Sequence, residues 1–273
     1  QQPASSLIIQ LELGQPSHER HFSEILRELE QRGHTVRRTA CRKDCPGLVE
    51  RQVAPGDHRS LMAFEAFVRD DQWGPLGYLI RASRDYLRYL RPEHAQSMII
   101  RERIRNMLDC GLRDVDTGVG GVLRAALENL PSDPGALAGV DAILDAIEGT
   151  IPPHPRIVDH LRGIGADVLC VTPLVVTQYG QTELVKAARA CGLPVVFLVG
   201  SWDNLTTKGT VHVRPDFTFV WNEIQREEAS RFHGLSPETV RVVGAGRFDD
   251  FWERSIEVSR EDHCRRFGLD PSR

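Results

Sequence analysis

The chain has 273 residues, of which 41% are hydrophobic and 26% are charged, and its formal net charge is −4. This composition is typical of a soluble globular protein with one large domain or two small ones. Because both charge signs are interspersed and the balance is slightly acidic, we expect no nucleic-acid partner, which would usually need a basic surface. No apolar run is long enough to cross a bilayer, and residues 1–6 lack the features of a secretory signal.

The six cysteines are scattered along the chain. Cys41 and Cys45 do not have the two-residue gap of a zinc knuckle, and no second pair follows them. Cys170 and Cys191 lie in or beside apolar segments, where a free thiol behaves as a small hydrophobe. We therefore expect free thiols rather than a metal site or a disulfide framework, and a reducing, cytoplasmic compartment.

The start of the chain has an α/β pattern. An apolar strand is expected over residues 7–13, followed by a turn over residues 14–17. Apolar side chains at helical spacing predict a helix over residues 18–32, which Gly33 ends, and a second strand over residues 34–39. Such strand–helix–strand units wind right-handed into parallel sheets. The sequence therefore predicts an α/β fold with a Rossmann-like parallel sheet and helices on both faces.

The pattern then becomes helical over about residues 59–150. We expect this block to be a helical insertion between the second strand and the rest of the sheet. Gly and Pro interrupt it often, so the boundaries of its helices are only coarsely defined. The expected helical segments cover residues 61–68, 79–90, 98–112, 121–130 and 136–147.

The α/β pattern returns after residue 151. Strands are expected over residues 166–171, 193–199, 217–221 and 240–243, and helices over residues 157–163, 181–190, 223–232 and 260–267. Residues 268–271 are a helix stop signal, after which this architecture would continue with another strand. We therefore expect the chain to be part of a longer protein.

The loops that leave the carboxyl ends of the strands are the places to look for a site, because ligands of open parallel sheets bind there. The first such loop contains His18 and His21, three residues apart at a helix start. An imidazole titrates near neutrality and can take a proton from an attacking hydroxyl, and a helix N-terminus favours its neutral form. His18 is our candidate general base and His21 a candidate substrate contact. The alternative is that both are solvated polar residues.

The second loop, residues 200–209, follows the most apolar strand. Trp202, Asp203, Asn204 and Lys208 combine a flat apolar ring with hydrogen-bonding groups, a mixture that suits a sugar. These four residues are candidate substrate contacts. The alternative is a structural turn in which Asp203 or Asn204 satisfies the local backbone.

The third loop contains Gly244, Gly246 and Arg247. The two glycines allow the backbone to approach a ligand closely, so these three residues are also candidate substrate contacts. The alternative is a tight strand-to-helix turn without a ligand. The spacing is not G-x-G-x-x-G, so no nicotinamide fingerprint is indicated.

A weaker candidate is the loop at residues 171–179, where Thr172, Thr177 and Gln178 are in a position to line the crevice. The chain has no phosphate-binding G-x-x-x-x-G-K-[ST] loop, no G-x-S-x-G elbow and no H-E-x-x-H metal motif. The residues alone therefore name no reaction.

Several of these stretches carry a family resemblance. They are SWDNL at residues 201–205, VWNEIQ at 220–225, VVGAGRFD at 242–249 and the opening HERHF at 18–22. Together they resemble bacterial GT-B type glycosyltransferase-like proteins associated with surface carbohydrates. The resemblance covers both ends of the chain, and the helical middle matches only loosely. The stretch from SWDN to GRFD is the specific part.

The resemblance implies a fold of two facing Rossmann-like domains, in which residues 1–273 form the N-terminal, acceptor-side domain and a C-terminal donor domain is missing. It implies transfer of a sugar from a nucleotide-sugar donor to a carbohydrate or other hydroxyl acceptor, without a metal or a further cofactor, and peripheral membrane association of the full enzyme is an open expectation. In several transferases of this fold a first-loop histidine deprotonates the acceptor, and His18 occupies a similar place. Ser17 stands where the family usually has glycine.

Two alternatives remain open at this point. The first is another activity on the same fold, either nucleotide-sugar epimerisation or glycerophosphate transfer. Residues 244–249 are similar to the segment near the domain junction in Kdo transferases and UDP-N-acetylglucosamine 2-epimerases. The second is a non-catalytic domain that uses the sheet crevice only to bind a carbohydrate or a protein.

Overall fold

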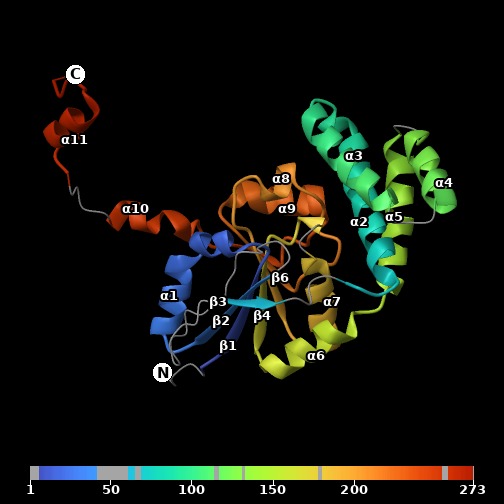
Figure 1. Ribbon diagram of the computed structural model, residues 1–273, viewed down its shortest axis with the longest axis horizontal. Coiled ribbons are helices and arrows are strands. Elements are labelled where there is room, and N and C mark those ends of the chain that lie inside the picture. Colours follow the sequence, from blue (N-terminus) through green and yellow to red (C-terminus); the bar gives the residue numbers. More distant parts are fainter. Residues whose placement is uncertain are drawn as a thin grey trace.

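The computed structural model describes residues 6–41, 61–64, 69–113, 117–130, 133–177, 180–253 and 258–272. Within these residues, seven strands form one sheet in the order β3-β2-β1-β4-β5-β6-β7, and every pairing is parallel (Figure 1). The predicted α/β class with a parallel sheet is thus confirmed. The strands are β1 (Ile8–Leu13), β2 (Thr35–Cys41), β3 (Leu61–Phe64), β4 (Val168–Thr172), β5 (Val195–Leu198), β6 (Phe217–Val220) and β7 (Val240–Val242).

The strand order reverses direction between β1 and β4. The chain adds β2 and β3 on one side of β1, and β4 to β7 on the other. Leu13 at the end of β1 pairs with Ala40 of β2 and with Thr172 of β4, so the carboxyl ends of these strands are level. This reversal is the topological switch point at which ligands of open α/β sheets bind.

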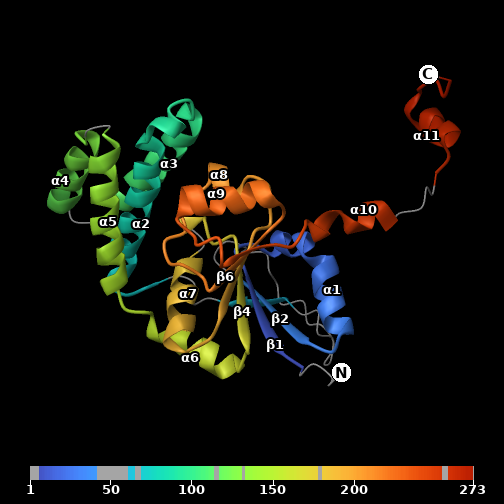
Figure 2. The same ribbon diagram turned by 180° about the vertical axis from the view of Figure 1, so that it is seen from behind.

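Helices cover both faces of the sheet. Helix α1 lies on one face, and α6 and α7 lie on the other (Figures 1 and 2). The helices outside the insertion are α1 (Ser23–Gln31), α6 (Pro155–Ile164), α7 (Gln181–Ala190), α8 (Asn204–Thr207), α9 (Glu223–His233), α10 (Asp249–Glu253) and α11 (Arg260–Phe267). Short 3-10 turns are η1 (Pro16–His21), η2 (Pro92–His94) and η4 (Gly246–Phe248).

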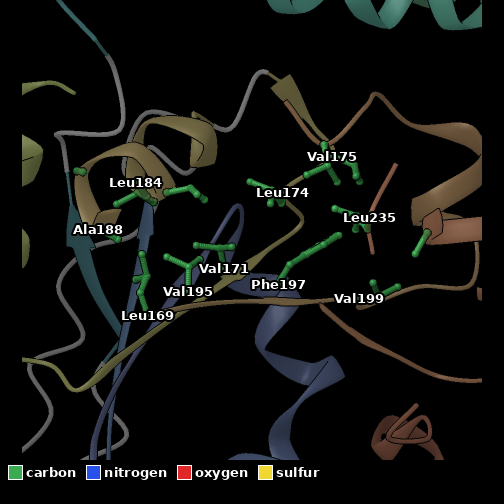
Figure 3. Packing of buried hydrophobic residues seen from close by; sticks show 14 of the residues in the cluster. Leu169, Val171, Leu174, Val175, Leu184, Ala188, Val195, Phe197, Val199 and Leu235 are labelled. Atoms are coloured by element: carbon green, nitrogen blue, oxygen red, sulfur yellow. The ribbon is translucent and has the colours of Figure 1, made fainter. Parts of the chain in front are cut away.

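The packing of the sheet follows the alternation of side chains along each strand. Leu11 and Leu13 of β1 pack with Leu26 of α1. On the other face, Leu169 and Phe197 belong to the cluster that contains residues of α6, α7 and α9 (Figure 3). Apolar side chains therefore pack on both faces of the sheet, as is usual for an all-parallel sheet, although Gln10 and Glu12 of β1 are also buried.

The helix expected over residues 18–32 is interrupted near its start. The 3-10 turn η1 covers Pro16–His21, and α1 begins only at Ser23. The break lies at Phe22, whose φ of −127° is not helical. Gln15 and His18 hydrogen-bond each other's backbone reciprocally across η1, which stabilises this separate turn.

The prediction of a helix over residues 61–68 is wrong for its first half. Leu61–Phe64 forms strand β3, which pairs with β2 so that Arg38 aligns with Leu61. A short apolar run does not by itself distinguish a buried helix from an edge strand. Residues 65–68 lie outside the described residues.

The rest of the expected insertion is helical. It forms a bundle beside the sheet, made of α2 (Trp73–Leu90), α3 (Met98–Arg113), α4 (Thr117–Glu128) and α5 (Pro134–Thr150) (Figures 1 and 2). The bundle has its own apolar core, which includes Leu79, Tyr89, Ile104, Leu108 and Leu137. One of its helices, α2, also contributes to the site described next.

Candidate functional site

A cavity of about 430 Å³ opens at the carboxyl edge of the sheet, at the switch point. We call it the switch-point cavity. The loops after β1, β4 and β5 form one side of its wall, and helices α2 and α3 of the bundle form the other. The lining residues are His18, Asp85, Arg103, Ile104, Met107, Pro173, Val175, Val176, Thr177, Ser201, Asp203, Asn204, Lys208 and Gly209.

Four of the predicted site residues meet in this cavity. His18 comes from the first strand-end loop, and Asp203, Asn204 and Lys208 come from the loop after β5. Thr177 of the weaker candidate loop, residues 171–179, joins them. Residues far apart in the sequence therefore line one space, as the position of ligands in open parallel sheets predicts.

Trp202 and Thr172 are not among the residues that line the described cavity. Trp202 is 72% exposed. Stacking of a sugar on this ring inside the cavity is therefore not available. Thr172 is buried at the end of β4. Gln178 lies outside the described residues.

Asp203 organises the polar side of the cavity. Its carboxylate accepts hydrogen bonds from the hydroxyls of Ser201 and Thr207 at 2.7 and 3.0 Å, and it pairs with Lys208 Nζ at 3.1 Å. Burial alone would raise the pKa of Asp203, but these hydrogen bonds and the lysine charge outweigh it and hold the pKa below its ordinary value. The carboxylate is ionised at neutral pH, so it acts as a hydrogen-bond acceptor.

Asn204 stabilises the local backbone, which was the predicted alternative to contact with a ligand. Its Oδ1 accepts from the backbone amides of Gly200 and Ser201, both at 3.1 Å. The side chain thereby closes the turn that follows β5. It also lines the cavity, so the turn and the cavity wall are the same feature.

His18 is held in one tautomer by its own loop. The backbone N–H of Gln15 donates to His18 Nδ1 at 3.2 Å, so the neutral ring carries its proton on Nε2. Burial and the charge of Arg20 lower the pKa of His18, which favours that neutral ring. In this arrangement Nε2 is a donor. Action as a general base requires the other tautomer, and the role of base stays a prediction.

A buried aspartate on the bundle helix α2 was not among the predicted residues. Asp85 Oδ1 accepts from the backbone N–H of Thr210 at 2.6 Å and lies 3.1 Å from His212 Nε2. Its Oδ2 accepts from the Thr177 hydroxyl at 2.8 Å. Burial alone would raise the pKa of Asp85, but the charge of His212 and these hydrogen bonds outweigh it and lower the pKa. Asp85 therefore ties two strand-end segments to the bundle.

The Asp85 cluster resembles a catalytic triad only superficially. In a triad the histidine bridges the carboxylate and the hydroxyl through its two ring nitrogens. Here the same nitrogen, His212 Nε2, lies 3.1 Å from Asp85 Oδ1 and 3.2 Å from the Thr177 hydroxyl, and that hydroxyl donates directly to the carboxylate. A carboxylate with a lowered pKa is also a weak base. Gly209 packs so closely on this group that an added Cβ would lie 2.4 Å from Asp85 Oδ2. We conclude that Asp85 positions the cavity wall.

Two further buried side chains hold the same segment. Arg88 donates to the carbonyls of Leu205 at 2.6 Å and Gly209 at 2.9 Å. His233 lies 2.8 Å from the Leu205 carbonyl through Nε2, and its Nδ1 accepts from the Val211 amide at 3.2 Å. Burial, with the nearby charge of Arg88, lowers the pKa of His233 to about 3. The neutral ring thus serves as both donor and acceptor.

The third predicted loop and His21 do not line the switch-point cavity, although the ring of His21 lies 6.2 Å from that of His18. The turns η1 and η4, which contain His21 and Arg247, are in contact, and burial and the charge of Arg247 lower the pKa of His21 to about 4. An added Cβ on Gly246 would lie 3.0 Å from Ile25, so the close approach at this glycine is to helix α1. Gly244 has a φ of +84°, a conformation that glycine adopts readily. These features describe a tight turn.

Among the described residues, no group of three or more histidine, cysteine, aspartate or glutamate side chains is arranged to hold a metal ion. No described helix is both long and apolar enough to span a membrane. Comparison of the chain with protein-family models and with curated proteins found no match.

Proposed function

We propose that the switch-point cavity binds the hydroxyl acceptor of a group-transfer reaction, and that the transferred group is a sugar from a nucleotide-sugar donor. One observation carries the proposal. His18, Asp203 and Lys208, selected from the sequence for this role, line a single cavity at the switch point of the sheet.

The walls of the cavity suit a sugar or polyol. Ile104 and Met107 of α3 provide an apolar wall, and the carboxylate of Asp203 and the ammonium of Lys208 are among the polar groups. A sugar has apolar ring faces and a rim of hydroxyls, so it matches both kinds of surface. The volume of about 430 Å³ is within the usual range for small-molecule sites.

His18 is the residue that we assign to the acceptor hydroxyl. As the tautomer fixed by Gln15, it donates from Nε2 and can orient the oxygen. To remove the proton it must release the Gln15 amide and carry its own proton on Nδ1. The proposal therefore includes a rearrangement of η1 when the acceptor binds.

Binding of the acceptor can be tested with the chain itself. Ligand-observed NMR with a panel of monosaccharides and polyols should detect a binder. Asp203→Asn and Lys208→Met should each weaken that binding about tenfold, since a hydrogen bond to a charged group contributes on the order of 1.5–3 kcal/mol. Arg162→Ala changes an exposed arginine on α6 and is the matched control. Binding that is equal in all four proteins would contradict the proposal.

Transfer is tested with the native protein. A labelled nucleotide-sugar should give a labelled product only when the acceptor is present, and His18→Ala should lower the rate by about 10²–10⁴-fold if His18 is the base. Label that moves without an acceptor identifies an epimerase. Transfer of a glycerophosphate group instead of a sugar identifies the other activity of this fold.

A specific observation also favours a second candidate, carbohydrate binding without catalysis. The hydrogen bond from Gln15 to His18 Nδ1 keeps the ring in the tautomer that does not accept a proton at Nε2. Sugar binding that is saturable, independent of any nucleotide and retained in His18→Gln, with no transfer by the native protein, would support this alternative.

A further inference from the structure

A second cavity, of about 570 Å³, lies between the bundle and the α/β part of the chain. Its wall combines α2 and α5, the segment 210–214, and the ends of α7 and α9. Six arginines line it, together with the carboxylates of Asp141, Asp145 and Glu148. We call it the arginine cleft. Its arginines are Arg84, Arg88, Arg91, Arg189, Arg214 and Arg231.

The three carboxylates are already paired. Asp141 and Asp145 lie 2.8 and 2.7 Å from the guanidinium of Arg84. Glu148 is bound by Arg81, which is outside the cleft, at 2.7 Å. Arg91 has only a distant contact, 3.9 Å from Asp141. The acids therefore neutralise little beyond Arg84 and Arg81.

The other four cleft arginines form no ion pair with a described carboxylate. Arg189 donates to the backbone carbonyl of Arg214 at 2.9 Å, and Arg231 stacks on the ring of Phe232 at 5.2 Å. Arg88 is 4% exposed, and its Nε has no hydrogen-bond partner within the described chain. Burial lowers the pKa of Arg88, even though the nearby charges of Asp85 and Glu228 act in the opposite direction.

The ordinary explanation for such arginines is the helix dipole. Arg88, Arg189 and Arg231 are in the last turns of α2, α7 and α9, where cations are favourable by about 0.3–1 kcal/mol. This explanation does not cover Arg214, which follows no helix end. It also does not account for the presence of all four arginines in the wall of one cavity. An anion in the cleft accounts for both.

We propose that the arginine cleft binds the phosphate group of a soluble small molecule. Guanidinium groups match phosphate oxygens in paired, charge-assisted hydrogen bonds, and the volume suits a small phosphorylated ligand better than a flat surface contact. Thr210 and His212 line this cleft while Asp85, their partner, lines the switch-point cavity. The two cavities thus share a wall. The proposal does not depend on sugar transfer.

The test is isothermal titration calorimetry of the chain with pyrophosphate and with inorganic phosphate at low ionic strength. We expect saturable binding of one pyrophosphate that weakens as salt is added. Arg214→Ala with Arg231→Ala should weaken binding at least about tenfold. Both arginines are exposed, so the variant should fold, and thermal unfolding checks this. If the double variant does not fold, Arg214→Gln alone is tested in its place. Arg162→Ala, on α6, is the control and should bind as the wild type does.

Sedimentation with vesicles separates two sources of the phosphate. Pyrophosphate binding without capture by phosphatidic-acid vesicles identifies a soluble ligand, as proposed. Capture by phosphatidic-acid vesicles but not by phosphatidylcholine vesicles, without pyrophosphate binding, overturns the soluble ligand and points to a lipid headgroup. Absence of saturable binding to any of these probes, or an equal loss in Arg162→Ala, overturns the site itself. Sugar binding at the switch-point cavity would be unaffected by either failure.

Discussion

The layers of the sheet and the attachment of the bundle are held together by different forces. Under the sheet, residues such as Leu169 and Phe197 are fully buried in an apolar cluster. Between the bundle and the sheet, Arg81 of α2 lies 2.7 Å from Glu148 of α5 and 2.5 Å from Glu183 of α7. All three are at most 5% exposed. One boundary is apolar and the other is a buried charge network.

The two boundaries therefore have different roles: the apolar one stabilises the fold, and the charged one fixes how the bundle is oriented. Apolar burial is non-directional, whereas a network of ion pairs accepts only one geometry and is costly if a partner is missing. Asp85 lies one helical turn after Arg81 on the same helix. When the network fixes the rotation of α2, it also directs Asp85 toward Thr177 and His212. We infer that the charges are used to orient the cavity wall.

The largest expected effect comes from breaking the network. Arg81→Ala removes the common partner of Glu148 and Glu183, which retain only Lys186 and Arg69 respectively. The loss of a buried ion-pair partner costs about 3–5 kcal/mol of unfolding free energy. Urea unfolding measures it. Arg162→Ala, an exposed arginine, should change the unfolding free energy by less than about 0.5 kcal/mol. A loss of unfolding free energy below about 1 kcal/mol in Arg81→Ala would show that water solvates the network.

A comparable but somewhat smaller loss is expected from the apolar boundary. Leu169→Ala removes a fully buried side chain between the sheet and its helices, at a cost of about 2–5 kcal/mol. The matched control is Ile143→Ala in α5, where the side chain is 62% exposed. Sugar binding at the switch-point cavity should survive Leu169→Ala in the folded fraction but not Arg81→Ala. That result would show that only the charge network orients the cavity wall.

An intermediate effect is expected from pH, through His233. Its pKa falls from the ordinary 6.5 to about 3 in the folded chain, so between these values the unfolded chain binds the proton more readily. Folding stability should therefore be complete above pH 6.5 and fall by about 1.4 kcal/mol for each pH unit below it. His233→Gln cannot titrate, so its stability should fall less steeply over the same range. Parallel curves would contradict the assignment.

The smallest expected changes in stability test whether the bundle and the α/β part of the chain unfold together. Asp133 caps α5 in the bundle and Asn222 caps α9 beside the sheet, each by accepting a hydrogen bond from a backbone amide. Replacement of either residue by alanine should cost about 1 kcal/mol. If the network couples the parts, both variants shift one shared calorimetric transition. Two transitions, each moved by only one variant, would show that the bundle unfolds by itself.

Local patterns predicted most of the fold. Five of the expected strands coincide with β1, β2, β4, β5 and β6 within about two residues at each end, and β7 lies within its expected range. Apolar runs between turn residues are strong signals because the sheet is buried on both faces. The edge strand β3 was missed because its four residues carry no period that separates strand from helix.

The candidate site was predicted less completely. Residues on strand-end loops were found because their place follows from topology alone. Asp85 was missed because Arg81, Asp85 and Arg88 are spaced as one charged stripe of a helix, which usually faces solvent. The signal was that Leu79, Tyr86 and Tyr89 leave α2 little surface to expose. Local spacing cannot show that a charged stripe will be buried by segments a hundred residues later.

That separation also sets when the site can form. Asp85 is 92 residues before Thr177 and 125 residues before Thr210, two of its hydrogen-bond donors. Contacts between such distant segments form slowly, because a long loop must close before they stabilise anything. During synthesis the bundle is complete before residue 210 leaves the ribosome, and Asp85 must wait for its partners. The cavity is therefore among the last parts of the molecule to form.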